Sequence, residues 1–543
     1  MIGSRPVRAH EAAALLVAAV VVLPTAIVAG SLFLTGSGET WSHLRQTVLA
    51  DYVFNSAILV CGVVALACFL GIPAAWFTSM CDFPLRRVFV WLLPLPLAMP
   101  AYIVAYTYTG LLDYSGPVQS TFRNAFGWRR DEYWFFEIRS LGGAAAMIGF
   151  VLYPYVYLLC RTSFLERSMK TVEVGRTLGN NVPRSFLRLS LPLARPAIAA
   201  GAALVAMETL ADYGTVFHFG VNTFTTGIFK VFYGLDDSIA ALQLSAMLLG
   251  AIALLLTCER LARNRARYDA TIGNFPTSRL PLSRRSTALA WLFCGLPVLL
   301  GFLLPVSILV KWAVLDNGWN LIDHAADAWN SLLLAFLAAA ISVSLAMVLG
   351  YAGRASHRKS VRMAVSLSSL GYAIPGTIIA VGLLGPLVWL DHRLIGLARD
   401  TFSVDIGLVL SGSIAALLYA YTVRFMAVSF GAVTAGMEKI KPSLDYSARS
   451  LGKRPHQVLM TVHLPLLKGT LLTALLIVFL DVLKELPATL ILRPFNFNTL
   501  AVRAYELASD ERLTDAATPS IMIVLIGIIP VVILNRITGR AHS

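Results

Sequence analysis

The sequence predicts an all-α integral membrane protein with about twelve transmembrane helices, arranged as two parallel six-helix repeats. Of the 543 residues, 57% are hydrophobic and 14% are charged, whereas a soluble protein carries roughly 25% charged residues. Many windows reach the length of about 20 apolar residues that a membrane-spanning helix needs. In addition, motifs of the N-terminal half recur in the C-terminal half at a nearly constant offset.

The apolar runs place six predicted spans in each half of the chain. Those of the first half lie near 11–34, 54–78, 88–112, 141–163, 195–213 and 237–258. Those of the second half lie near 287–311, 329–353, 364–390, 406–428, 468–490 and 517–535. The first run follows Arg5 and Arg8 and is too long for the apolar core of a signal peptide, so we expect it to be a retained helix.

Basic residues are concentrated in alternate short loops, and this distribution predicts the orientation. The loops after the second, eighth and twelfth spans are basic, which assigns them to the cytoplasm. The loop after the seventh span contains Asp316, Asp323 and Asp327 and fits the outside. Both termini are therefore expected in the cytoplasm. The cytoplasmic assignment rests on Arg86, Arg87, Arg354, Arg358, Lys359, Arg362, Arg536 and Arg540.

Composition and motifs exclude or disfavour several other functions. The formal net charge of +14 lies mostly in these loops, so it indicates membrane topology and not a nucleic-acid partner. The six cysteines form no CxxC pair or Cys/His cluster, and the nine histidines are dispersed, which disfavours a zinc site, a disulfide framework and an enzyme. We expect His456 and His463 to be solvated or to contact a partner. No GxxxxGK[ST] phosphate loop occurs, so the chain is not itself an ATPase.

The two halves form a direct repeat. Asn55-Ser56 corresponds to Asn330-Ser331 and Pro100 to Pro375 at an offset of 275, and the offset is 273 further along. An even number of spans per repeat gives parallel halves with a pathway between them. We therefore expect repeats at 1–258 and 287–543. The basic interval 259–286 is interpreted as a cytoplasmic linker, the alternative being a lipid-binding or regulatory patch. The two prolines are candidates for kinks in helices that line the pathway.

Each half contains one long, structured cytoplasmic stretch, at 164–194 and 429–467. Gly179 precedes Pro192 by thirteen residues, and Gly452 precedes Pro465 by the same distance. Glycine permits a tight turn between two short helices, and proline suits the first turn of the following helix. An amphipathic piece lies between them. One such piece could be an interfacial helix without a partner, but two at equivalent positions favour docking surfaces.

The motif E-V-G-R-T-L-G followed by L-P resembles the EAA loop of ABC-importer permeases, whose coupling helix inserts into the ATPase subunit. The resemblance places the family's Glu at Glu173, its Gly at Gly179 and its L-P at Leu191-Pro192. In the second copy Gly452 and Leu464-Pro465 match, but Tyr446 stands in place of the Glu, with Asp445 before it. The two ATPase contacts are therefore expected to differ.

This resemblance covers essentially the whole chain and is closest to fused permeases that follow the type I importer fold. It implies two copies of a separate ATP-binding subunit inside the cell, so that ATP is bound by the partners and the chain needs no cofactor. It also implies a periplasmic or lipid-anchored substrate-binding protein outside, and a location in the bacterial cytoplasmic membrane in contact with lipid.

Two pairs of carboxylates follow the coupling stretches. Glu208 aligns with Asp481 and Asp212 with Glu485, and the two members of each pair share a helix face because they are four residues apart. Intramembrane ionisable residues usually face a cavity or pair with one another. Four carboxylates across the two-fold interface would form a negative ring suited to a hard cation. Alternatively they pair structurally, with Lys484 neutralising Asp481 or Glu485.

The segments ETLADYGTV and KELPATLILRPFNFNTLAVRAY resemble those of ferric-iron permeases in the fused group. This likeness implies ferric iron as cargo, although similar permeases import thiamine, phosphonates or other small solutes. Lys230 aligns with Arg503 at the 273 offset; both could contact an anion or the binding protein, or be solvated loop charges. An ion-coupled secondary transporter is the other alternative, but it does not explain two structured cytoplasmic stretches.

Overall fold

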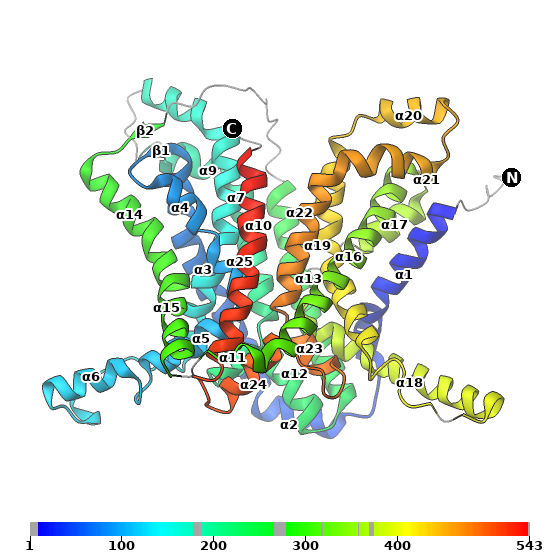
Figure 1. Cartoon of the computed structure of the whole chain (residues 1–543), viewed down its shortest axis with the longest axis horizontal. Coiled ribbons are helices and arrows are strands. Elements are labelled where there is room, and N and C mark those ends of the chain that lie inside the picture. The colour runs from blue at the N-terminus through cyan, green and yellow to red at the C-terminus, as the bar shows by residue number, and fades with distance from the viewer. Residues whose placement is uncertain are drawn as a thin grey trace.

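The computed structural model describes residues 9–177, 184, 186–264, 279–316, 319–356, 358–368, 374–404 and 406–540. These residues are almost entirely helical (Figure 1). The α-helices of the first half are α1 (Ala9–Gly30), α2 (Gly38–Thr47), α3 (Leu49–Met80), α4 (Arg86–Leu92), α5 (Ala101–Leu112), α6 (Pro117–Phe126), α7 (Leu141–Thr177), α9 (Leu191–Leu193), α10 (Arg195–Ala211), α11 (Gly214–His218), α12 (Phe224–Phe229) and α13 (Ser238–Asn264).

The α-helices of the second half are α14 (Arg284–Val298), α15 (Leu304–Lys311), α16 (Ala325–Ala355), α17 (Lys359–Ser368), α18 (Gly376–Phe402), α19 (Ile414–Glu438), α20 (Pro442–Ser450), α21 (Pro455–Val458), α22 (Leu464–Leu483), α23 (Pro487–Leu492), α24 (Leu500–Ser509) and α25 (Ala517–Arg540). A π-helical turn, η6 (Leu299–Leu303), joins α14 to α15. The short strands β1 (Cys81–Asp82) and β2 (Leu280–Pro281) pair in parallel.

The number of predicted spans is confirmed. Within the described ranges, ten helices are long and apolar enough to cross a membrane, and two bent helix pairs raise the number to twelve. The predicted span 88–112 corresponds to a pair bent by 92°, and the predicted span 195–213 to the second member of a pair bent by 64°. Pro100 lies in the break of the pair bent by 92°, directly before α5, so the predicted bend is present there. Pro375 directly precedes α18 and does not lie inside a helix.

The repeat is visible in equivalent contacts of the two halves. The side-chain amide of Asn55 donates to the carbonyl oxygen of Asn222 at 3.0 Å, and that of Asn330 donates to the carbonyl oxygen of Asn498 at the same distance. The neighbouring Ser56 and Ser331 hydroxyls each accept a backbone N–H at the start of the next short helix, α12 or α24. The motif Asn-Ser thus fixes the start of the short helix α12 or α24 in each half.

Within the described residues, the two largest hydrophobic clusters do not follow the division into halves. One core combines α3, α5 and α7 with α14, α15 and α25 of the second half. The other combines α16, α18, α19 and α22 with α1 and α13 of the first half. Each half therefore lends its first helix to the opposite half, and α1 packs against α16, α17 and α18. Glu11 on α1 accepts a hydrogen bond from Ser356 at 2.7 Å and pairs with Arg358 at 3.4 Å.

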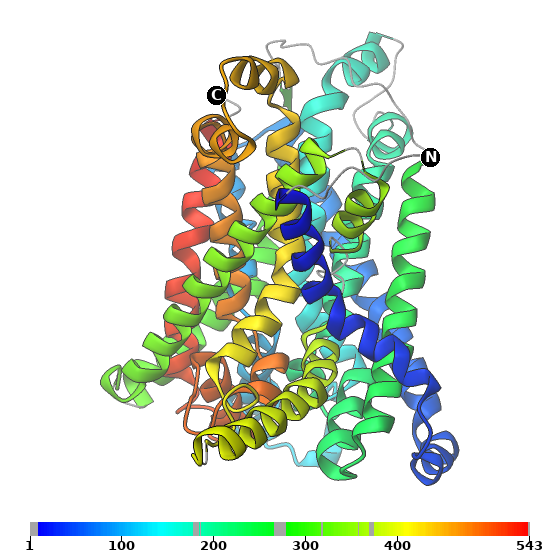
Figure 2. The ribbon, with the colours of Figure 1, turned by 90° about the vertical axis from the view of Figure 1, so that its right-hand side faces the viewer.

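The two ends of the molecule differ. Figures 1 and 2 show α20, α21, the start of α1 and the end of α25 at one end of the bundle. The opposite end carries α2, α12 and α24, and from it α6 and the C-terminal part of α18 extend sideways (Figure 1). The end that carries α20 and α21 is called the coupling end below.

Candidate transport pathway and coupling surface

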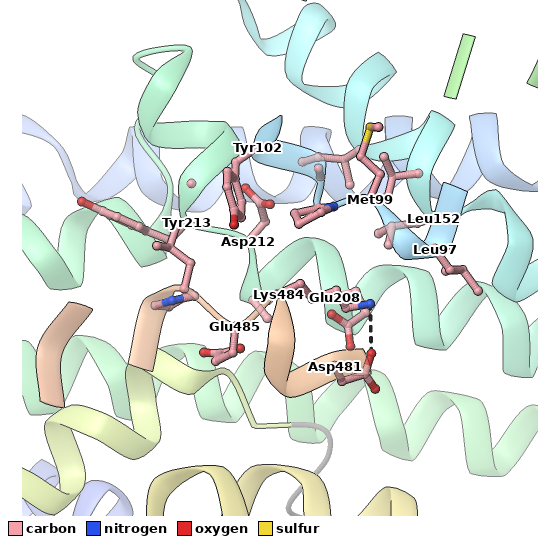
Figure 3. A pocket seen from close by; sticks show the side chains of 18 of the residues that line it. Leu97, Met99, Tyr102, Leu152, Glu208, Asp212, Tyr213, Asp481, Lys484 and Glu485 are labelled. Atoms are coloured by element: carbon pink, nitrogen blue, oxygen red, sulfur yellow. Dashed lines mark ion pairs between the residues drawn. The ribbon is translucent and has the colours of Figure 1, made fainter. Parts of the chain in front are cut away.

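A cavity of about 90 Å³ lies between the two halves, at the ends of α10 and α22 that face away from the coupling end. Figure 3 shows the side chains that line it. Its wall is formed where α10 and α22 end, where the short helices α11 and α23 follow them, and where α5 begins. All four predicted pathway carboxylates and Lys484 line it. The ionisable side chains of the wall, apart from tyrosines, are Glu208, Asp212, Arg424, Asp481, Lys484 and Glu485.

Asp212 in the first half and Glu485 in the second half each lie between the end of one helix and the start of the next. Asp212 accepts hydrogen bonds from the backbone N–H groups of Thr215 and Val216 at 3.0 and 3.2 Å, and from the Thr215 hydroxyl at 2.9 Å. Glu485 accepts one from the backbone N–H of Ala488 at 3.1 Å. A carboxylate at this position satisfies N–H groups that lack a partner in the first helical turn. Both residues therefore shape the polypeptide around the cavity.

Two ion pairs neutralise the carboxylates of the second half. Lys484 lies 2.9 Å from Asp481, and Arg424 lies 2.8 Å from Glu485. The cavity wall is thus not a purely negative ring. In the part of the chain that the structure describes, no three His, Cys, Asp or Glu side chains are placed to hold a metal ion.

Sequence reasoning missed Arg424. The signal was present, because an arginine inside the predicted span 406–428 is itself a candidate for a cavity or an ion pair. Repeat symmetry could not have found it: the equivalent residue of the first half, at the offset of 273, is Val151.

The first coupling stretch is described only in part. The side chain of Glu173 and all of Gly179 lie outside the described residues. Leu191 begins α9 and Pro192 occupies its first turn, as expected for a proline at a helix start. The chain then bends into α10, which runs to the cavity.

The second coupling stretch is described completely and folds as two short helices. Gly452 lies between α20 and α21 with φ of +81°, so the predicted glycine turn is confirmed in this copy. Leu464 begins α22, and Pro465 lies in its first turn. Tyr446 and Leu451 are 69% and 81% exposed. These two side chains therefore form part of a free surface at the coupling end.

Asp445 points into the protein. Its carboxylate accepts hydrogen bonds from Arg354 at 2.7 Å and from His463 at 2.6 Å, and Arg354 also donates to the carbonyl oxygens of Met437 and Ile440. Burial alone would raise the pKa of Asp445, but the hydrogen bonds and charges of its two partners hold that pKa below its ordinary value. The contacts tie α20 to α16, α19 and α22, so the geometry gives Asp445 a positioning role.

The expectation for His463 was wrong, because its side chain is completely buried beneath α20. His456 is exposed, as expected. Both histidines lie in a polar loop, and the sequence contains no signal that separates the buried one from the solvated one.

A valine at position 452 is expected to loosen the second coupling stretch. A left-handed backbone costs an L-residue about 1–2 kcal/mol, and a Cβ at Gly452 would meet no other atom, so backbone strain is the whole effect. Such a cost raises the population of locally opened chain by roughly 5–30-fold. Limited proteolysis at Arg449 and Lys453 would measure it. Gly469→Ala, at a helical glycine with open space around it, is the control and should leave the rate of cleavage unchanged.

The alignment of Lys230 with Arg503 is wrong. Thr223 caps α12 and Thr499 caps α24, so this region repeats at an offset of 276. The connection from Asp212 to Thr223 spans 11 residues and that from Glu485 to Thr499 spans 14, which is an insertion of three. Lys230 therefore corresponds to Glu506. Lys230 is exposed and donates to Asn222 at 2.7 Å, whereas Arg503 is half-buried.

Fold and site together define a polytopic membrane transport protein with parallel halves, a polar cavity between them and a partner surface at one end. No family model matches the chain. Over 498 residues it is 26% identical to the Fe(3+)-transport system permease protein FbpB 2 of Haemophilus influenzae, covering 90% of both chains. It is 24% identical over 502 residues to the ferric transport system permease protein FbpB of Actinobacillus pleuropneumoniae, covering 87% of this chain and 69% of that one.

Shorter permeases match only part of the chain. The putative 2-aminoethylphosphonate transport system permease protein PhnV of Salmonella typhimurium is 25% identical over 279 residues, which is 48% of this chain and 97% of PhnV. The molybdenum transport system permease protein ModB of Escherichia coli is 26% identical over 233 residues, 40% of this chain and 99% of ModB. The predicted resemblance to fused permeases, most like those for ferric iron, is confirmed.

Proposed function

We propose that this protein is the transmembrane permease subunit of an ATP-driven importer whose cargo is ferric iron. The observation that carries the proposal is the similarity to a Fe(3+)-transport permease over 90% of both chains. The matches to phosphonate and molybdenum permeases cover less than half of this chain. The carboxylates of the cavity supply the oxygen ligands that a hard cation prefers.

The partners follow from the two ends of the molecule. Two ATP-binding subunits dock at the coupling end, one at α20–α21 and one at the first coupling stretch. These partners bind the ATP, and the chain itself performs no covalent chemistry. A periplasmic or lipid-anchored binding protein delivers cargo at the opposite end, where Lys230 and Arg503 are candidate contacts. We assign the coupling end and both termini to the cytoplasm, which the basic loops support. The similarity to bacterial permeases supports a location in the bacterial inner membrane.

The connection between the partner surface and the cavity supports alternating access. The helix α22 begins at Leu464 beside the coupling helices and ends at Leu483, directly before Lys484 and Glu485. Its 20 residues span about 30 Å. In the first half, α10 follows α9 in the same way and ends at Ala211, beside Asp212. Movement of a docked ATPase is therefore transmitted along one helix in each half to the cavity.

A second candidate cargo is a phosphonate, thiamine or another small solute carried by the same type of permease. Arg424 and Lys484 in the cavity wall favour it, because they could bind an anion if their carboxylate partners moved away. An ion-coupled secondary transporter has less support, since it leaves the exposed coupling surface around Tyr446 without a role.

Uptake of labelled ferric iron tests the proposal. Deletion of the gene should abolish binding-protein-dependent uptake, and the native gene should restore it. A gene carrying Glu208→Gln with Asp481→Asn should restore at most about a tenth of the uptake rate. A tenfold decrease corresponds to the loss of roughly 1.4 kcal/mol of cargo binding. Asp400→Asn, at an exposed carboxylate on α18 outside the cavity, is the control at equal membrane levels. Unchanged iron uptake in the deletion strain would rule out the iron assignment and move the search to phosphonate and thiamine.

A further inference from the structure

The charges of the cavity wall are distributed unequally between the halves. Four carboxylates and two cations leave a net charge of −2. Both cations belong to the second half: at the offset of 273, Arg424 corresponds to Val151 and Lys484 to Ala211. The second half therefore neutralises its own carboxylates, and the first half contributes the excess negative charge.

Two oxygen-bearing side chains of the cavity wall, Glu208 and Tyr102, have no hydrogen-bond or ion-pair partner within the described residues. Glu208 has neither kind of contact, unlike the other three carboxylates. Tyr102 is 5% exposed and its hydroxyl is buried without a hydrogen bond. A buried polar group without a partner is costly and rare in native structures. Tyr102 lies beside Asp212 in the cavity (Figure 3), so its hydroxyl is available to a bound ligand.

The two cations differ in how firmly they are held. Arg424 and Glu485 are 10% and 4% exposed, and both pack so closely on Gly376 that a Cβ at that position would overlap them. The planar guanidinium group of Arg424 is therefore held in one position by Glu485 and by the backbone of Gly376. Lys484 is 21% exposed, and its ammonium sits at the end of a flexible stem. The ion pair of Arg424 with Glu485 is therefore a fixed part of the cavity wall, whereas the ammonium group of Lys484 can move away from Asp481.

Figure 3 shows the ion pair of Lys484 with Asp481 and, beside it, the carboxylate of Glu208 from the other half of the protein. The ion pair to Asp481 is 2.9 Å long, and Glu208 also acts electrostatically on the ammonium. A positive charge on the protein thus occupies the position between the two halves where two carboxylates converge.

We propose that Lys484 is a tethered cation that occupies the cargo position of the cavity until a multivalent cation displaces it. This inference rests on the proposed function, in which the cargo is ferric iron. Displacement of the lysine offers the cargo the carboxylate oxygens of Glu208 and Asp481, and the hydroxyl of Tyr102 lies further along the same cavity, beside Asp212. Because Coulomb attraction scales with charge, a trivalent cation competes with the lysine and a monovalent ion does not. Lys484 is thereby a specificity-determining residue.

Terbium(III) binding to the purified full-length chain in lipid nanodiscs tests the inference. Terbium is a hard trivalent cation, and its luminescence is sensitised by nearby tyrosines such as Tyr102. We expect Lys484→Met to raise the terbium affinity at least about tenfold, and Glu208→Gln to lower it by a similar factor. Lys484→Arg keeps the charge and should not raise the affinity. Lys468→Met, at an exposed lysine on α22, the helix that directly precedes Lys484, should leave it unchanged.

Equal terbium affinities for the parent chain and Lys484→Met would overturn the inference, provided that both elute as single species in size exclusion. Terbium luminescence that is insensitive to Glu208→Gln would overturn it too, because the ion would then bind elsewhere. Neither result bears on the importer itself, which the uptake experiment tests separately. Conversely, if the cargo proved not to be iron, a measured effect of Lys484→Met on the terbium affinity would still stand.

Discussion

Methionine in place of Arg354 is expected to cause a large loss of stability at the coupling end. The change leaves the buried carboxylate of Asp445 without its cationic partner and removes two hydrogen bonds to backbone carbonyl groups of the α19 end. Removing one partner of a buried ion pair costs about 3–5 kcal/mol. Thermal unfolding of the purified protein should show a clearly lower midpoint, and an ATPase subunit should no longer co-purify.

Two further variants separate this explanation from a general effect of surface charge. Lys359→Met removes an exposed cation from the neighbouring α17 and should change nothing. Replacing both partners, as Arg354→Met with Asp445→Leu, should recover part of the stability, because an apolar pair avoids the cost of an unpaired buried charge. The recovery is partial, since the buried His463 loses its hydrogen-bond partner Asp445. An unfolding midpoint of Arg354→Met equal to that of the parent would show that α20 is held by other contacts.

The substitution Gly301→Val is expected to displace the first helix of the second half (α14, η6 and α15), which packs against the first half. Gly301 lies in η6, and a Cβ there would overlap the carbonyl oxygen of Phe150 on α7. Backbone cannot move aside as a flexible side chain does, so the cost should reach about 3 kcal/mol or more. The measurement is the yield of monodisperse protein together with its unfolding midpoint.

The same helix provides a matched control for this prediction. A Cβ at Gly295 would approach only the ring of Phe89, at 3.8 Å, which is an ordinary contact. Gly295→Val should therefore behave like the parent chain. If both valine variants were equally stable, the close approach of η6 to α7 would not be important for the fold.

Much of the architecture could be predicted because it rests on periodicities that the sequence displays. The apolar runs predict twelve crossings, and the direct repeat predicts their parallel arrangement. The four carboxylates could be placed together because equivalent positions of two parallel halves must meet at their interface. The predicted bounds were least accurate where proline or a capping side chain overrides hydropathy, as at Pro375, where α18 begins twelve residues later than expected.

Features that break the repeat could not be predicted from it. The pairing of Arg424 with Glu485 has no counterpart in the first half, and a three-residue insertion shifts the register so that Lys230 and Arg503 are not equivalent. The exchange of first helices is also hidden, since an apolar helix can bury the same surface against either half. The direction of Asp445 depends on Arg354, 91 residues away in the sequence, and no local pattern indicates this contact.

The exchange of first helices has a consequence for the biosynthesis of the protein. The helix α1 is synthesised long before its packing partners α16, α17 and α18, which begin more than 300 residues after the start of α1. During translation α1 can pack against α13 of its own half, but its contacts with α16, α17 and α18 must wait until those helices have been inserted. The helix α1 therefore completes its tertiary contacts only after the first half has been synthesised, and the interval 259–286 keeps the first half at a high effective concentration for the second half.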